Sequence, residues 1–414
     1  MTTHMRFFKT LTLALMASVF CMAAHAQFSV SIPYAMERGK MIVSAEVNGV
    51  KGRFVLDTGA PCALSSEFAR KAGISSGQEI TASDSNGNPV KTRVLMLGSL
   101  KLGATSFRKV QALELDMKSN PAFSLFHIDG LIGYTLLKMG ALSIYGREHK
   151  AVFASAAPTD GDSGTRYVAM PHHPMLALVP LQIGNATDTV MFDSGEDRVY
   201  VMSRHKHDAL AAQHTQGIRT LGEGMGFSSM GVGGVEAATR KVRVCTDTLA
   251  LAGYKLANVC CIATDNPTSR IGTGLLAYGD ITIDYIHNTF AFSPHTDTTP
   301  DLYQPDWDVV ITVTPDGWLR AGIVWDKRLA IQSGDRVVEV NGHRFDNKLD
   351  MREATTKSFT ALSGNKAVIK FINKKGKEQK VVIKKEAIKL RVEKRKASQI
   401  FRLARLFLCA SRWT

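Results

Sequence analysis

Two short segments 136 residues apart constrain this chain more than any other feature. They are residues 54–59 (FVLDTG) and residues 190–195 (VMFDSG), and each is an apolar run that ends in an aspartate, a small hydroxyl residue and a glycine. The sequence around them repeats as well: at an offset of 139, Gly133 matches Gly272 and Phe153 matches Phe292. A repeat of this length indicates one structural unit that is used twice.

Both copies of the repeat are predicted to consist mainly of strands. In residues 27–160, apolar runs separated by turn residues predict a strand that leads into Asp57, and a long hairpin with Asn86-Gly87 at its tip. One short helix is expected over residues 66–72, with a serine as its cap. In residues 161–297 the hairpin at the equivalent place is longer and rich in glycine.

The two aspartates carry chemistry only if the two loops meet. Gly59 and Gly195 permit tight turns and close approach of a second backbone, and the hydroxyl groups of Thr58 and Ser194 can form hydrogen bonds to the opposite loop. Two carboxyl groups within hydrogen-bond reach share one proton, for which aspartic proteases are the standard example. The ionised carboxylate then takes a proton from water while the protonated one polarises a carbonyl group. We therefore predict hydrolysis of peptide bonds by Asp57 and Asp193, without metal or cofactor.

One Asp-Thr-Gly sequence is most often an ordinary turn, but two at equivalent positions of a repeat favour a paired site. Each is followed by an apolar-Gly element, ending in Gly133 or Gly272, that we expect to pass beside the aspartate loop and pack against it. The alternative is a duplicated β fold with acidic turns and no catalysis.

Residues 35–295 resemble the aspartic peptidases of the retropepsin-like kind, with two lobes in one chain as in pepsin-like enzymes. Residues 57–60 (DTGA) carry the closest similarity. The resemblance implies a mostly β fold with two homologous β-barrel lobes of the acid-protease type, a polypeptide substrate, and a flap over the cleft near Asn86-Gly87. It also implies a catalytic pair and its supporting residues: Asp57 and Asp193, supported by Thr58, Gly59, Ser194, Gly195, Gly133 and Gly272.

The second site departs from the family pattern at two positions. Glu196 follows Gly195 where the family usually has a small residue, and Arg270 replaces an apolar residue. Extra carboxylates beside the pair raise its pKa values or require a basic partner, for which Arg198 and Arg270 are candidates. Two functions remain: an exported aspartic endopeptidase, or a catalytically degenerate exported protein that binds peptides or serves as a scaffold.

Residues 306–386 form a third and different unit. Residues 333–342 (SGDRVVEVNG) resemble a segment of PDZ domains, which implies an α+β domain. PDZ domains add an extended C-terminal peptide to a sheet edge and capture its carboxylate. A module that only packs against the protease is the alternative.

The two ends of the chain predict export of the protein and contribute most of its positive net charge. Residues 1–26 have a short positive start, an apolar stretch and a small-residue cleavage site, which predicts a secretory signal and a periplasmic or extracellular protein. The net charge is +14, but residues 384–414 alone contain ten Lys or Arg against two Glu. We therefore predict no nucleic-acid partner. The basic tail, residues 387–414, has helical spacing; contact with a membrane surface is less favoured than a disordered end or a helix on the PDZ sheet.

Five cysteines remain after removal of the signal segment, and an oxidising compartment permits disulfides. Cys245 is predicted to pair with Cys260 or Cys261, a choice that the sequence leaves open. No cysteine spacing fits a zinc site, so no metal is expected.

Overall fold

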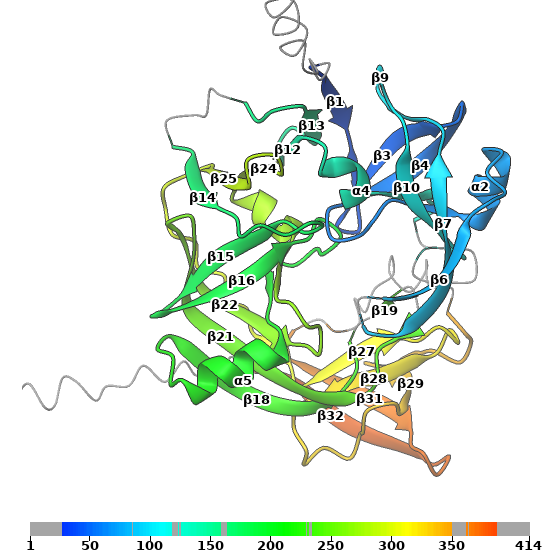
Figure 1. The fold of residues 1–414 in the computed structure, drawn as a ribbon. Coiled ribbons are helices and arrows are strands. Elements are labelled where there is room, and N and C mark those ends of the chain that lie inside the picture. Colours follow the sequence, from blue (N-terminus) through cyan, green and yellow to red (C-terminus); the bar gives the residue numbers. More distant parts are fainter. Residues whose placement is uncertain are drawn as a thin grey trace, which may run out of the picture.

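The computed structural model describes residues 27–84, 86–117, 123, 126–158, 164–228, 230–231, 234–349, 362 and 364–386. Strands make up most of this part of the chain, as the sequence predicts (Figure 1). The predicted signal segment and the predicted basic tail lie outside the described residues. Within those residues, no helix is both long and apolar enough to cross a membrane.

The first repeat forms a ten-stranded sheet in the order β6-β7-β10-β5-β11-β4-β3-β8-β9, with β2 paired to β3. One short helix, α2 (Ser66–Lys71), begins after Ser65, whose hydroxyl accepts a hydrogen bond from the N–H of Phe68. The strands are β2 (Ala35–Glu37), β3 (Lys40–Val47), β4 (Val50–Asp57), β5 (Ala63–Ser65), β6 (Gln78–Ser83), β7 (Pro89–Leu97), β8 (Leu100–Leu102), β9 (Thr105–Phe107), β10 (Val110–Leu115) and β11 (Gly130–Gly133).

The strand that leads into Asp57 lies inside this sheet. β4 pairs antiparallel with β3 on one side and parallel with β11 on the other. Its last apolar residues, Phe54 to Leu56, are all buried because the strand has neighbours on both edges and side chains on both faces. The apolar run before the aspartate is thus the sequence signature of a central strand.

The second repeat places its strands in the same way. β16 pairs antiparallel with β15 and parallel with β23, and β18 and β21 form the long glycine-rich hairpin. The elements of this repeat are β15 (Leu178–Ile183), β16 (Ala186–Phe192), β17 (Tyr200–Val201), α5 (Arg204–Ala212), β18 (Ile218–Gly226), β19 (Met230–Gly231), β20 (Gly234–Val235), β21 (Thr239–Leu251), β22 (Tyr254–Ala263), β23 (Arg270–Ile271) and the 3-10 helix η1 (Thr273–Ala277).

A six-stranded sheet joins the two repeats, in the order β1-β13-β12-β24-β25-β14. Three strands of the first repeat are followed by three of the second, and the central pair places Leu142 opposite Ile283. One buried hydrophobic core runs through both repeats. The elements are β1 (Ser29–Pro33), α4 (Tyr134–Leu137), β12 (Ala141–Tyr145), β13 (Lys150–Ala154), β14 (Arg166–Ala169), β24 (Gly279–Asp284) and β25 (Thr289–Pro294).

The prediction of β-barrel lobes is wrong in one respect. In the part of the chain that the structure describes, no sheet closes on itself in hydrogen-bonded order. The physical reason is that the last strands of each repeat do not return to their own sheet. They pair with each other instead and form the joining sheet.

The third unit has its own core but shares a sheet with the second repeat. The end of β18 pairs antiparallel with β28, so that Met225 lies opposite Val324 and Gly226 opposite Ile323. A Cβ on Gly226 would lie 1.9 Å from the carbonyl oxygen of Gly322, so only glycine permits this contact. The strands are β26 (Asp306–Trp307), β27 (Val309–Val313), β28 (Leu319–Val324), β29 (Arg336–Val340), β30 (His343–Arg344), β31 (Lys366–Ile372) and β32 (Glu378–Glu386).

A buried arginine strengthens this junction. The guanidinium of Arg243, on β21, lies 4.4 Å from the ring centroid of Trp325 and donates hydrogen bonds to Asp306 and to the carbonyl oxygen of Trp307. The sequence predicted a separate unit after a linker. It gave no sign of this contact, because the two sides are distant in the chain.

The disulfide left open by the sequence joins Cys245 to Cys260. The two cysteines stand directly opposite each other on β21 and β22. Cys261, the other candidate, is free, as is the buried Cys62.

Candidate active site

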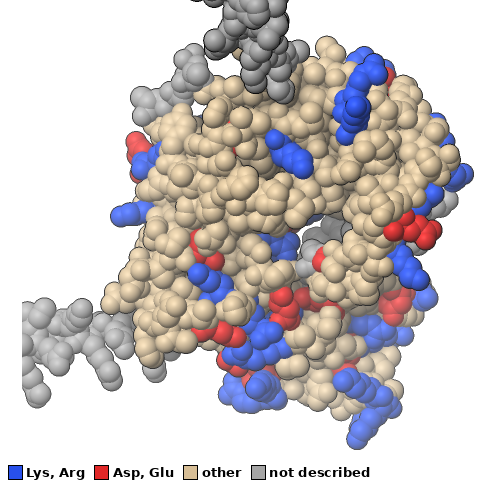
Figure 2. Space-filling model, viewed as in Figure 1, with Lys and Arg blue, Asp and Glu red and all other residues tan. Residues whose placement is uncertain are grey.

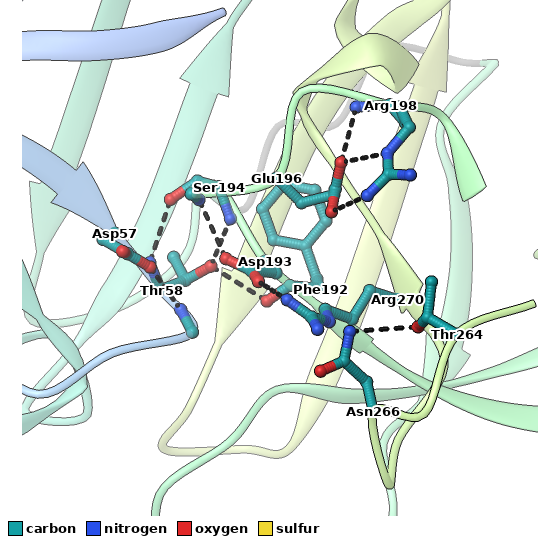
Figure 3. A network of polar contacts seen from close by, with 12 residues as sticks. Asp57, Thr58, Phe192, Asp193, Ser194, Glu196, Arg198, Thr264, Asn266 and Arg270 are labelled. Atoms are coloured by element: carbon teal, nitrogen blue, oxygen red, sulfur yellow. Dashed lines mark hydrogen bonds and ion pairs between the residues drawn. The ribbon is translucent and has the colours of Figure 1, made fainter. Parts of the chain in front are cut away.

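The two aspartate loops meet and exchange hydrogen bonds (Figure 3). The N–H of Thr58 donates to Ser194 Oγ, and the N–H of Ser194 donates to Thr58 Oγ1, both at 2.9 Å. Each hydroxyl then donates to a carbonyl oxygen on the opposite side: Thr58 to Phe192 at 2.9 Å, and Ser194 to Leu56 at 2.8 Å. Thr58 and Ser194 are both fully buried. The hydroxyl residues of the repeated motif therefore lock the two loops together.

This lock brings the two carboxyl groups against each other's loop. A Cβ on Gly59 would lie 2.6 Å from Asp193 Cγ, and one on Gly195 would lie 2.6 Å from Asp57 Oδ2. Each carboxyl group also accepts a hydrogen bond from the glycine of its own loop. Gly59 N–H donates to Asp57 Oδ1 at 3.0 Å, and Gly195 N–H donates to Asp193 Oδ1 at 2.9 Å. Glycine is thus required at both positions, because the carboxyl group of the opposite loop lies too close for any side chain.

The electrostatics of Asp57 are those of a buried carboxyl group beside a second one. Burial raises the pKa of Asp57, and the charge of Asp193 raises it further; Lys40 and the N–H of Gly59 act in the opposite direction. A hydrogen bond between the two carboxyl groups adds to the increase, and the resulting pKa of Asp57 is about 7. Near neutral pH, Asp57 can therefore hold a proton that an ordinary aspartate would lose.

The apolar-Gly elements lie beside the aspartate loops. On β11, Gly133 stands opposite Asp57 in the parallel pair with β4. A Cβ on Gly133 would lie 2.0 Å from the carbonyl oxygen of Ala60, and one on Gly272 would lie 2.3 Å from that of Glu196. These two glycines allow the loops to be supported at equivalent places in both repeats.

The charged residues of the second loop are paired in a specific way. Arg198 Nε lies 2.7 Å from Glu196 Oε1, and a second guanidinium nitrogen bonds the other oxygen. Burial alone would raise the pKa of Glu196, but Arg198 more than offsets this and holds it at about 2. Of the two candidate arginines, Arg198 is therefore the partner of Glu196. Arg270 Nη1 lies 3.3 Å from Asp193 Oδ2 instead.

Sequence reasoning missed two residues near the pair. Lys40, at the start of β3, donates a hydrogen bond from Nζ to the carbonyl oxygen of Gly195. The hydroxyl of Tyr285 is buried without a hydrogen-bond partner in the described structure, and its pKa is raised by burial and by the charge of Asp57. Neither residue belongs to a motif; only long-range pairing brings them to the site.

The predicted hairpin around Asn86-Gly87 is present. β6 and β7 pair from Gln78 to Ser83, and Asp84 accepts hydrogen bonds from the N–H groups of Asn86 and Asn88 at the turn. Its role as a flap remains a prediction. Figure 2 shows this face of the molecule hollowed near its middle, between the first repeat above and the third unit below.

Among the described residues, no three His, Cys, Asp or Glu side chains are grouped as ligands of a metal ion.

Comparison with known families agrees with the first half of this site. Residues 43–136 match the family described as aspartyl protease. The match contains Asp57, Thr58, Gly59 and Gly133, so this part of the chain is similar to aspartyl proteases of the retropepsin-like kind. It does not extend to the second repeat or to the third unit. A comparison with curated proteins found no match.

We predict that Gly59→Ala separates the two carboxyl groups, because the added Cβ would overlap the Asp193 carboxylate. The pKa of Asp57 should then fall below about 7, since the contributions of Asp193 weaken. An NMR titration of labelled aspartates measures this value. Gly222→Ala, where an added Cβ meets nothing within 4 Å, is the matched control. A pKa of Asp57 that stays near 7 in the Gly59→Ala variant would contradict the geometry.

We also predict a pH-dependent effect of Asp57→Asn on stability. Because the pKa of Asp57 is raised from 3.8 to about 7, its contribution to stability is fully present below pH 3.8 and is lost as pH rises through 7. Relative to the wild type, the variant should therefore become more stable as pH increases over this window. Thermal unfolding of both proteins at several pH values measures the difference. A difference that does not vary with pH would show that Asp57 has no raised pKa.

Proposed function

We propose that this protein is an aspartic endopeptidase that cleaves extended polypeptides with a water molecule activated between Asp57 and Asp193. The observation that carries the proposal is the contact of each carboxyl group with the opposite loop, fixed by the exchange between Thr58 and Ser194. Two fused lobes are supported by the equivalent strand pairs of the two repeats and by the symmetric order of the joining sheet.

The proposed reaction needs only the two carboxyl groups and water. The ionised carboxylate takes a proton from water as the water oxygen attacks the peptide carbonyl carbon, and the protonated carboxyl group gives its proton to the carbonyl oxygen. The product is a gem-diol. The first carboxyl group then gives its new proton to the leaving nitrogen as the C–N bond breaks. One gem-diol hydroxyl returns a proton to the other aspartate, so the pair is restored and one water is consumed.

The test is hydrolysis of a denatured polypeptide between mildly acidic and neutral pH. Asp57→Asn should reduce turnover by about 10³-fold or more, because an asparagine amide cannot take part in the proton transfers of the carboxyl pair. Asp297→Asn, which changes an exposed carboxylate, should retain wild-type turnover. Equal turnover by Asp57→Asn and the wild type would refute the proposal.

A second function is favoured by one observation. Arg270 occupies an oxygen of Asp193 with an ion pair, at a position where the first repeat has the apolar Leu131. In this alternative the protein is a degenerate exported scaffold that binds peptides. Peptide binding that a transition-state mimic such as pepstatin does not displace, together with no cleavage at any pH, would favour it.

We propose that the third unit is a PDZ-like domain, supported by the antiparallel strands β28, β29 and β31 and by the buried Asp335 of its motif. One observation favours a packing role over peptide capture. Val324 of β28 already pairs with Val309 on one side and with Met225 on the other. A peptide added to β28 would have to displace β18.

If the third unit captures peptide C-termini, peptides with a free carboxylate should bind the whole protein more tightly than the same peptides with an amidated end. Fluorescence anisotropy with a set of labelled peptides measures this. Equal binding of both forms, or none, would assign the unit to packing.

We further propose that the protein is exported, on the strength of the signal-like residues 1–26. Sequencing of the N-terminus of the protein from expressing cells tests this proposal, because cleavage would leave Gln27 as the first residue.

A further inference from the structure

The two halves of the carboxyl pair are not equivalent. Arg270 opens β23, and the repeat offset of 139 places Leu131 at the matching position of β11. Leu131 is buried among apolar side chains, whereas Arg270 reaches Asp193 (Figure 3). The sequence is symmetric at the aspartates, and the asymmetry comes from the neighbouring strand.

Hydrogen-bond donors are also unequally divided between the two carboxyl groups. Asp193 accepts from the N–H of Gly195 at Oδ1 and from Arg270 at Oδ2. Asp57 accepts from the N–H of Gly59 at Oδ1, and apart from the carboxyl group of Asp193 no other described residue is hydrogen-bonded to its carboxyl group. A carboxyl group with donors on both oxygens is stabilised as the carboxylate.

Arg270 is available for this role because the nearby acid has another partner. Both oxygens of Glu196 are bonded by Arg198, and Arg270 contributes only the smallest of the effects that lower the pKa of Glu196. The side chains of Arg270 and Asp193 are only 12% and 9% exposed, so water screens their attraction weakly.

The other charged and titratable groups around the pair are few. Lys40 approaches from β3, on the first repeat, and favours ionisation of Asp57. Glu196 and Arg198 form a neutral pair on the loop after β16, and Asp197 of the same loop lies against Gly39. Tyr285, which follows β24, is neutral. Among these groups, Arg270 alone contacts an aspartate of the pair through an ion pair.

We propose that Arg270 is a positioning residue that keeps the shared proton on Asp57 and leaves Asp193 as the base. The inference rests on the proposed function and assigns a role to each aspartate. Asp193 takes the proton from water, and later gives it to the leaving nitrogen. Asp57 gives its proton to the peptide carbonyl oxygen and recovers one from the gem-diol.

The first experiment locates the proton without any need for activity. Carbon-13 NMR of the labelled aspartate carboxyl groups is recorded against pH in the wild type, in Arg270→Leu and in Arg270→Lys. In the wild type we expect Asp57 to carry the retained proton between about pH 4 and 7. In Arg270→Leu, which copies the residue of the first repeat, the lower midpoint of the pair should rise by about 1 to 3 pH units. Arg270→Lys should restore most of the wild-type titration.

The second experiment follows hydrolysis by the same three proteins. The acid limb of kcat/KM should move to higher pH in Arg270→Leu and return in Arg270→Lys. A merely structural role would lower the rate at all pH values without moving the limb. Thermal unfolding of each protein shows that it is folded.

The outcomes distinguish a failure of the role of Arg270 from a failure of the proposed peptidase function. If the titration of Arg270→Leu is the same as that of the wild type, the role of Arg270 is refuted whether or not the protein is a peptidase. If the titration shifts as expected but the wild type cleaves no polypeptide, the proposed function fails and the proton placement stands.

Discussion

The structure depends on four buried hydrogen bonds between the loops after β4 and β16. Thr58 and Ser194 each donate and accept across the gap between the repeats, and no water can replace these bonds because both residues are fully buried. Removal of one hydroxyl would leave a buried N–H without a partner, at a cost of about 1–3 kcal/mol. The exchange therefore fixes where the two carboxyl groups lie, and the glycines allow them to approach. The proposed sharing of one proton by the two carboxyl groups requires this arrangement.

The rest of the fold holds the two loops in register. The joining sheet pairs β12 with β24, and one hydrophobic core crosses the boundary between the repeats. The third unit is attached to the hairpin β18–β21 through the backbone at Gly226 and through Arg243, which packs on Trp325. In Figure 2, charged side chains gather over the lower part of this face, which contains β18 and the third unit, while the upper part is mostly uncharged. The third unit is thus anchored on the second repeat.

The sequence was most informative where chemistry is local. The apolar runs before Asp57 and Asp193, the glycines after them and the turn around Asn86 all act within a few residues, so strands and turns followed from the pattern. The pairing of Thr58 with Ser194 was also predictable, because the repeat made the two loops equivalent. Three features were not. The pairing of β18 with β28, the approach of Lys40 and the open sheets of the described residues depend on contacts between distant segments.

Arg270 illustrates the limit of pattern reasoning. It is recognised in the sequence as a departure from an apolar position, but the sequence leaves open whether Arg198 or Arg270 is the partner of the extra carboxylates. The geometry of Arg198 decides the matter, since it occupies both oxygens of Glu196. The asymmetry of the carboxyl pair thus comes from Arg270, which lies 77 residues from Asp193 in the chain.

The most direct test of the account is the neutron structure of the deuterated protein, crystallised at about pH 5.5, between the ordinary and the raised pKa of Asp57. The account predicts carboxyl groups within hydrogen-bond distance of each other, a single deuteron on Asp57, and an ionised Asp193 in contact with Arg270. Two carboxyl groups that are both ionised, or that lie too far apart to share a deuteron, would contradict it.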